Sequence, residues 1–251
     1  MSHIGTTDFY TEVQKGNVAG HSLVHKFGRN EGVPNGSWEV VNLLGSTWPI
    51  LTAATTVRVK AGAATDAAGL TGAREITVQG IDSNLAEISE AVATAGASAS
   101  SATSASFWRV HRAWVSSAGN TAHNVAAVTI ENSAGGTDLI QIAAEEGQTQ
   151  FAAWSVPTGK TAYLLSLTAQ VDSNKTANIR LFNRAGLNDW SGAQASQRLK
   201  LFFDGVEGGL SFQPRSPGSA IPALSDIWVE AFGDGAVSEV SVDFELLVVD
   251  D

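Results

Sequence analysis

Residues 145–184 read "EEGQTQFAAWSVPTGKTAYLLSLTAQVDSNKTANIRLFNR", and this run contains three predicted strands separated by two turns. The turns lie at "VPTGK" (156–160) and "DSNK" (172–175), where Pro, Gly, Asp and Asn favour a reversal of the chain. Between them, apolar and polar residues alternate with the two-residue period of a strand that has one buried face. The run therefore predicts consecutive antiparallel strands.

The same alternation extends in both directions along the chain. "GIDSN" (80–84) and "NSAGGT" (132–137) each separate two alternating runs and predict hairpin turns. No segment before residue 150 keeps a helical period with a cap and a stop, and the serine-rich run 90–107 predicts a loop between two strands. Further strands are predicted at 55–60, 74–81, 85–92, 107–115, 124–131, 138–144, 197–203, 226–232 and 238–249.

Many short strands with no helical pattern between them predict an all-β protein with two antiparallel β-sandwich or jelly-roll-like domains and long loops. We expect an N-terminal assembly segment at 1–40, a first sandwich at 41–147 and a second sandwich at 148–251, because the texture of the sequence changes near Gly147. The proline-rich run 213–225 predicts an irregular crossover or projecting loop. The alternative is one continuous sandwich with a long insertion.

The composition narrows the classes of function. The 251 residues carry a net charge of −10 and no cysteine. The lack of cysteine excludes disulfides, thiolate metal sites and cysteine nucleophiles, and the acidic balance without a Lys/Arg cluster argues against direct binding of nucleic acid. No apolar run reaches the length of a membrane-spanning helix and no signal peptide is visible, so we expect no membrane partner.

"GHSLVHKFG" (20–28) holds His21 and His25, which a helix would bring to one face where a metal ion could bridge them. The flanking glycines oppose a helix and no third ligand is nearby, so the run predicts a turn segment with partly buried, hydrogen-bonded imidazoles. Ser22 lacks the second glycine of a nucleophile elbow, and no phosphate-binding loop or usable carboxylate pair occurs elsewhere. We therefore expect no catalytic residue, no metal site and no cofactor.

Aromatic residues give two kinds of expectation. Trp154 and Trp228 fall on predicted strands and are expected in the core, because their side chains bury a large apolar area. Trp190 lies in the polar run "GLNDWSGAQ" and is the best candidate for an exposed contact, with a host glycan as a minor alternative ligand. On the predicted strand 107–115, Arg109 and His111 share one face, opposite Trp108, Val110, Arg112 and Trp114.

"VQKGNVAGHSLVHKFGRNEGVPNGSWEVV" (13–41) resembles the start of a family of virion structural proteins of tailed bacteriophages that is common among marine phages. That family carries a Gly-His-Ser-(Ile/Leu/Val)-Val-x-Lys-Phe-Gly-x-Asn run followed by a tryptophan, which match residues 20–30 and Trp38 here. The segment between Asn30 and Trp38 is shorter than in the family. The likeness continues in order through 65–92, 106–120, 142–164 and 244–251.

The resemblance implies a non-enzymatic virion component that is assembled in the host cytoplasm and contacts other virion proteins. We expect an accessory or decoration protein on the capsid exterior that binds the major capsid protein and forms a homo-oligomer, with a trimer as the expected state. The alternative is a tail or tail-fibre component that contacts host glycans. "GHSLVHKFG" then becomes a strand-and-turn assembly element, and the expected interface residues are His21, Leu23, His25, Phe27 and Trp38.

Overall fold

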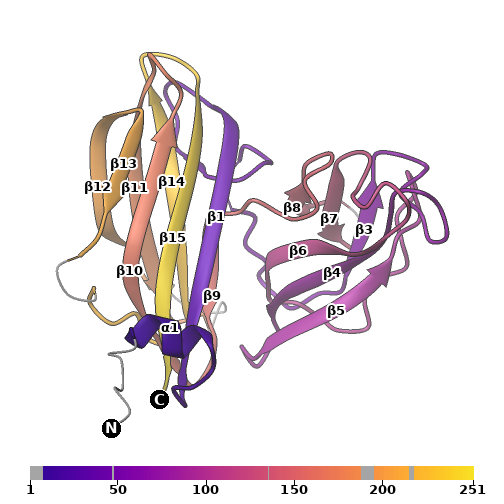
Figure 1. Ribbon diagram of the computed structural model, residues 1–251, viewed down its shortest axis with the longest axis horizontal. Helices are drawn as coiled ribbons and strands as arrows, with labels where there is room; N and C mark the ends of the chain where they lie inside the picture. Colours follow the sequence, from indigo (N-terminus) through magenta and orange to yellow (C-terminus); the bar gives the residue numbers. More distant parts are fainter. Residues whose placement is uncertain (1–7, 47, 135, 188–194, 215–217) are drawn as a thin grey trace, which may run out of the picture.

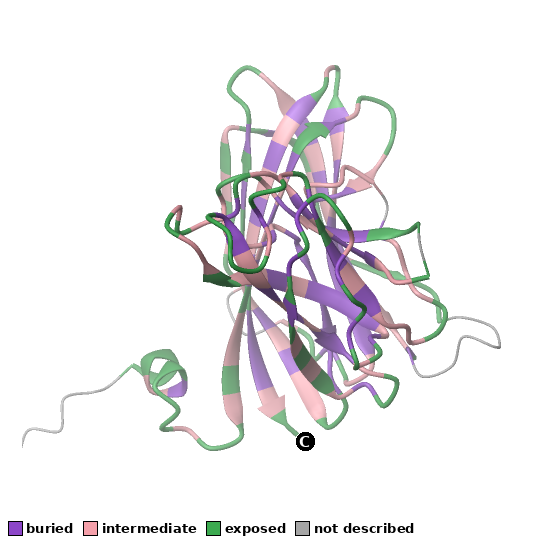
Figure 2. Cartoon of the chain, turned by 90° about the vertical axis from the view of Figure 1, so that its right-hand side faces the viewer, coloured by how far each residue is buried: buried purple, intermediate pink, exposed green. Residues whose placement is uncertain are grey.

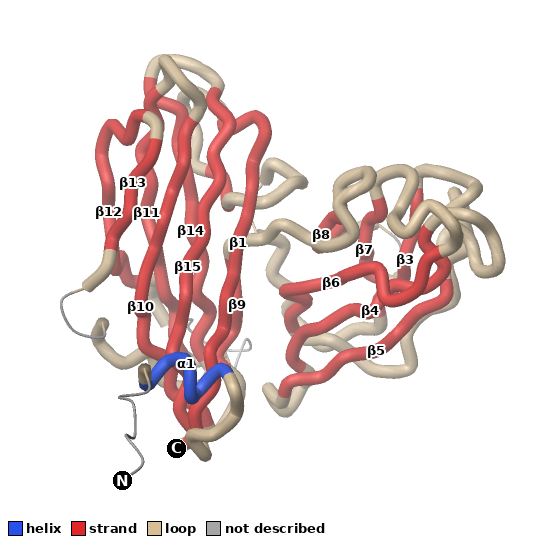
Figure 3. Tube along the Cα trace, in the orientation of Figure 1, coloured by secondary structure: helices blue, strands red, loops and turns tan. Residues whose placement is uncertain are grey.

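The computed structural model describes residues 8–46, 48–134, 136–187, 195–214 and 218–251. Within these ranges the chain forms one short helix and fifteen strands, and every pairing between named strands is antiparallel. The protein is all-β, which confirms the predicted fold class (Figure 3). The elements are α1 (Phe9–Gln14), β1 (His21–Val33), β2 (Glu39–Val40), β3 (Val57–Ala61), β4 (Ala73–Ile81), β5 (Glu87–Ala93), β6 (Arg109–Ala118), β7 (Val128–Asn132), β8 (Asp138–Ile142), β9 (Ala153–Val156), β10 (Lys160–Val171), β11 (Thr176–Ala185), β12 (Arg198–Glu207), β13 (Gly209–Phe212), β14 (Ser225–Asp234) and β15 (Ser238–Asp250).

The larger lobe, on the left of Figure 1, is a sandwich of two sheets. One sheet has the strand order β1-β15-β10-β13, and the other has the order β12-β11-β14-β2, with β9 also paired to β14. Alternate residues of β15, including Val240, Phe244 and Val248, are buried and meet Ile179 and Leu181 of β11 in one cluster. Each sheet therefore turns one face toward the core of the sandwich.

The smaller lobe, on the right of Figure 1, holds two three-stranded sheets with the orders β3-β7-β8 and β5-β4-β6. The hairpin β4–β5 reverses at residues 82–86, two positions after the predicted turn 80–84, and the hairpin β7–β8 reverses at the predicted turn 132–137. Ile76 and Val78 of one sheet join Ile130 and Ile142 of the other in a shared core. Both hairpins are short-range structures, so their turn residues were sufficient to predict them.

The path of the chain differs from the expected ranges 1–40, 41–147 and 148–251. β1 pairs with β15, with His21 opposite Val249 and Asn30 opposite Val240, and β2 pairs with β14. The larger lobe is thus built from both ends of the chain, and the smaller lobe is inserted between β2 and β9 (Figure 1). The described part of 1–40 contributes strands to a sandwich instead of standing apart, because its partner strand lies at the other end of the sequence.

The helix α1 was not expected from the sequence. Asp8 caps it by accepting a hydrogen bond from the backbone N–H of Thr11, and Gly16, at a φ of +75°, follows its last turn. Only Val13 of the helix is buried, and Figure 2 shows most of its surface exposed. Six residues are too few for an apolar period to be visible, so only the capping residues could have predicted it.

The two lobes share a packed core. Val40, Phe182 and Trp228 of the larger lobe belong to the same buried cluster as the core of the smaller lobe. The rings of Trp228 and Phe182 stack with centroids 5.5 Å apart, and Trp48 meets Trp228 edge-on at 6.1 Å. Trp154 and Trp228 are buried, as predicted. A continuous apolar interface of this kind holds two lobes in one orientation.

Gly28 of β1 packs against the two segments, at Val41 and Ala152, by which the chain leaves and re-enters the larger lobe. A Cβ atom there would overlap the backbone carbonyl of Val41 and the backbone amide of Ala152, which are themselves hydrogen-bonded to each other at 3.0 Å. We expect Gly28→Ala to lower the free energy of unfolding by about 1–3 kcal/mol, because neither backbone segment has room to move away. Chemical denaturation measures this loss.

Gly32→Ala is the matched control for that substitution. It lies on the same strand, and a Cβ atom there meets nothing within 4 Å. Its free energy of unfolding should equal that of the native protein or exceed it slightly, because alanine restricts the unfolded chain. Equal losses at Gly28 and Gly32 would contradict the close approach described for Gly28.

Candidate functional site

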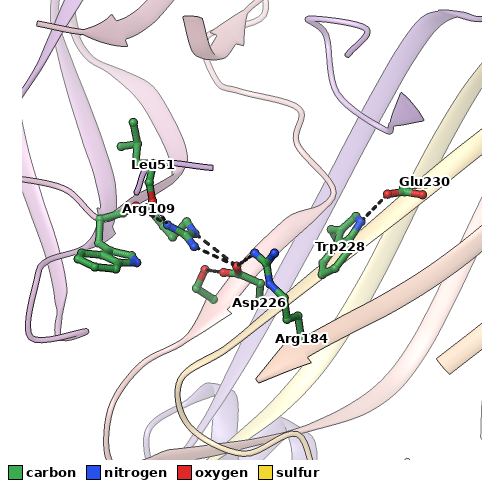
Figure 4. Close-up of polar contacts among 8 residues, drawn as sticks. Leu51, Arg109, Arg184, Asp226, Trp228 and Glu230 are labelled. Carbon is green, nitrogen blue, oxygen red and sulfur yellow. Dashed lines mark hydrogen bonds and ion pairs between the residues drawn. The ribbon is translucent and has the colours of Figure 1, made fainter. Parts of the chain in front are cut away.

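The junction between the lobes contains a buried ion cluster centred on Asp226 (Figure 4). Asp226 of β14 is fully buried and lies 3.3 Å from the Arg109 guanidinium of β6 and 3.0 Å from that of Arg184 of β11. Ser155 of β9 donates a hydrogen bond of 2.7 Å to the same carboxylate. Because Arg109 belongs to the smaller lobe and the others to the larger one, the cluster ties the lobes together.

Arg109 is held from several directions. Its Nη1 donates hydrogen bonds to the backbone carbonyls of Leu51 at 3.0 Å and Trp108 at 2.8 Å (Figure 4). Burial lowers the pKa of Arg109, and the Asp226 carboxylate opposes this shift by favouring the charged form. A guanidinium with only 1% of its residue exposed needs this compensation, since an unpaired buried charge is strongly unfavourable.

A second buried polar contact joins the lobes through Lys26 of β1 and His111 of β6. The Lys26 ammonium donates a hydrogen bond of 2.5 Å to the backbone carbonyl of His111. Burial, and next the charge of Arg112, lower the pKa of Lys26 to about 7, while Glu87 acts in the opposite direction. The pKa of His111 is held well below its ordinary value by burial and then by Lys26 and Arg112. The environment between the lobes therefore favours the uncharged forms of Lys26 and His111.

The predicted histidine pair lies on a strand. His21, Leu23, His25 and Phe27 of β1 lie opposite Val249, Leu247, Glu245 and Asp243 of β15, on the face turned away from the sandwich core. Residues four apart on a strand are separated by about 13 Å, so the two imidazoles are too distant to bind one metal ion. Among the described residues, no group of three or more metal-ligating side chains comes together.

The surroundings of the two imidazoles differ from the expected turn segment. His21 is partly buried, and its Nδ1 lies 2.9 Å from the backbone carbonyl of Ala19. His25 is exposed and forms an ion pair through Nε2 with the carboxylate of Asp243. Extended pairing with β15 explains the difference, because it replaces the turn that the flanking glycines indicated. The assembly roles of His21, Leu23, His25 and Phe27 stay predictions.

A groove of about 870 Å³ lies between α1 and this outer face. Its lining includes Tyr10 and Gln14 of α1, Leu23 and Phe27 of β1, and Glu245 of β15. The tilted rings of His25 and Phe27, with centroids 5.7 Å apart, form part of the same wall. The face of β1 thus presents apolar and charged groups to solvent next to a recess that α1 partly covers.

Trp38 lies on the opposite side of the larger lobe from the histidines. It rests on the outer face of the β12-β11-β14 sheet, where the Arg180 guanidinium carbon is 3.8 Å from its ring centroid. The rings of Phe232 and Phe202 lie at 5.4 Å and 6.1 Å. The five expected interface residues are therefore divided between two faces. Trp190, the expected exposed contact, lies outside the described residues.

Sequence reasoning placed Arg109 and His111 on one strand face without giving them a role. Both are buried, together with Ala113 on the same face of β6. Polar residues that alternate with apolar ones on a strand ordinarily indicate a face turned to solvent, so this pattern was no signal of an internal ion cluster. Nothing in the local sequence could have identified Asp226 as the partner, because 117 residues separate it from Arg109.

In the ranges that the structure covers, no helix is long and apolar enough to cross a membrane. No protein-family model matches the chain, and no curated protein matches it. Two solved structures of infectious bursal disease virus are weakly similar. The Gx strain gives a TM-score of 0.26 and 10% identity over 92% of this chain and 71% of that chain, and the Gt strain gives 0.22 and 9% over 92% and 75%. At such TM-scores the likeness supports no argument about this chain.

Proposed function

We propose that this chain is a structural protein of a tailed-bacteriophage virion, mounted on the outside of the head as an accessory or decoration protein. The observation that carries the proposal is the fixed junction of its two lobes, which share one apolar core and the ion cluster around Asp226. The resemblance of residues 13–41 to the phage family supplies the virion context.

A rigid junction suits a protein that works by presenting surfaces. Two lobes inside one chain usually move relative to each other unless their interface is large and apolar. Here Phe182 and Trp228 of the larger lobe lie inside the core of the smaller lobe, and Arg109 reaches back to Asp226. The outer sheet faces consequently keep fixed positions with respect to each other, as contacts to several neighbouring subunits require.

The partners that we propose are the major capsid protein and further copies of this chain. The outer face of β1, with Leu23, His25 and Phe27, offers apolar and ionic groups side by side, as protein interfaces do. A net charge of −10 disfavours contact with nucleic acid and keeps the free protein dispersed before assembly. In this function the protein makes and breaks no covalent bonds.

Copy number in purified particles tests the proposal. On the order of hundreds of copies per virion, measured by quantitative mass spectrometry against the major capsid protein, are expected for a symmetric head lattice. A few dozen copies or fewer would assign the chain to the tail or tail fibre. Labelling the protein in images of the particle gives the location directly. Absence of the chain from purified virions would overturn the virion assignment itself.

A further inference from the structure

Strand β12 is the outermost strand of its sheet and pairs only with β11 among the described strands. Two of its residues, Leu199 and Phe202, are 53% and 48% exposed. They lie on the outer face of the sheet beside Trp38, whose ring is 6.1 Å from that of Phe202. An end strand with large apolar side chains in solvent is a surface that favours a partner.

The charges of β12 are divided along its length. Its sequence, "RLKLFFDGVE" (198–207), places Arg198 and Lys200 before Phe202 and Asp204 and Glu207 after it. Within the described part of the chain, Arg198, Asp204 and Glu207 make no side-chain hydrogen bond or ion pair. Lys200 makes one, donating to the Ser219 hydroxyl at 3.2 Å. Within one copy of the chain, the described residues therefore provide almost no polar partners for the charged side chains of β12.

This order of charges is complementary to itself. When two β12 strands run antiparallel about a two-fold axis at Phe202, Lys200 of each lies opposite Asp204 of the other, because both are two residues from Phe202. Arg198 then lies at the level of Val206, next to Glu207, and the two Phe202 rings meet at the axis. Every basic residue of one strand faces the acidic half of its partner.

We propose that β12 is a docking strand for β12 of a second copy of this chain, arranged antiparallel about a two-fold axis near Phe202. Shifts in the register between β12 and β11 fall on either side of Leu201–Phe203, which limits regular backbone pairing to the centre of the strand. The contact is consequently held by Phe202 and Leu199 and by the Lys200–Asp204 pairs. It does not depend on whether the protein resides in a virion.

A charge exchange tests this contact in the purified protein. Sedimentation velocity at low salt should show a concentration-dependent dimer. Lys200→Glu and Asp204→Lys should each raise the dissociation constant by at least about tenfold, because like charges then face each other. The double variant K200E/D204K restores opposite charges across the axis and should return the dissociation constant to within about threefold of the native value.

The matched control is K60E/D138K on the smaller lobe, where both residues are exposed and lie away from β12. It makes the same charge changes and should leave the dimer unaltered. Phe202→Ser should weaken the dimer without a change in total charge, and circular dichroism checks that each variant is folded. A native protein that stays monomeric, or an oligomer that ignores the single reversals, or a double variant as weak as the singles, would overturn the proposal.

Discussion

Replacing Asp226 with alanine is expected to lower the free energy of unfolding by about 3–5 kcal/mol, because it leaves two guanidinium groups at the lobe junction without their carboxylate. Arg109 is 1% exposed and makes ion-pair contact with Asp226 at 3.3 Å, and Arg184 does so at 3.0 Å. Ser155 also loses the acceptor of its hydrogen bond. Denaturation in urea, followed by tryptophan fluorescence, measures the loss.

Asp250→Ala provides the control for an exposed pair. Asp250 lies 2.6 Å from Lys160, but more than half of its side chain is exposed, so its loss should be at most about 1 kcal/mol. The triple variant R109M/D226L/R184M removes all charges of the cluster together and should recover most of the stability lost in D226A. Similar small losses for D226A and D250A would show that water reaches the cluster and that it does not fasten the lobes.

The fold could be predicted from the sequence where its contacts are local. The hairpins β4–β5 and β7–β8 follow from turn residues between alternating runs. The turn "DSNK" correctly separates β10 from β11, but these two strands join different sheets, so it crosses between the two layers instead of closing a hairpin. The pairing of β1 with β15 could not be predicted, since neither strand indicates a partner more than 200 residues away. The assignment of residues 21–33 to the larger lobe depends on that pairing.

The candidate surfaces show the same limit. His21, Leu23, His25 and Phe27 share one face of β1, where the sequence had indicated a turn, and nothing in the sequence indicated which face Trp38 would join. Trp38 follows β1 by a few residues, yet it lies across the sandwich because β2 enters the second sheet. The face on which a residue lies depends on the sheet that its strand joins. Strands from distant parts of the chain form each sheet, so the local sequence does not determine that face.

Stability is expected to rise with pH between about 7 and 10.5 because of Lys26. An ordinary lysine has a pKa of 10.5, whereas burial and Arg112 lower the pKa of Lys26 in the folded protein to about 7. Between these values the unfolded chain binds a proton that the native protein does not, so the free energy of unfolding increases as protons are removed. The full shift corresponds to an upper limit of about 5 kcal/mol.

His111 acts in the same direction at lower pH. Burial, Lys26 and Arg112 keep the pKa of His111 well below 6.5. Below pH 6.5 this histidine therefore binds a proton in the unfolded chain before it does so in the native protein. Stability should fall further as the solution is acidified. Glu87 acts in the opposite direction, because burial raises its pKa and the native protein therefore takes up a proton there before the unfolded chain does.

Comparison of the native protein with Lys26→Met isolates the effect. Methionine fills a similar volume without a charge, so the stability of the native protein relative to K26M should increase steadily from pH 7 to 10.5. Lys60→Met replaces an exposed lysine and should give a difference that does not vary over that range. If the free energy of unfolding varied with pH in the same way for the native protein and for K26M, the Lys26 ammonium would be accessible to water. The contact between the lobes would then be less tightly packed than the structure indicates.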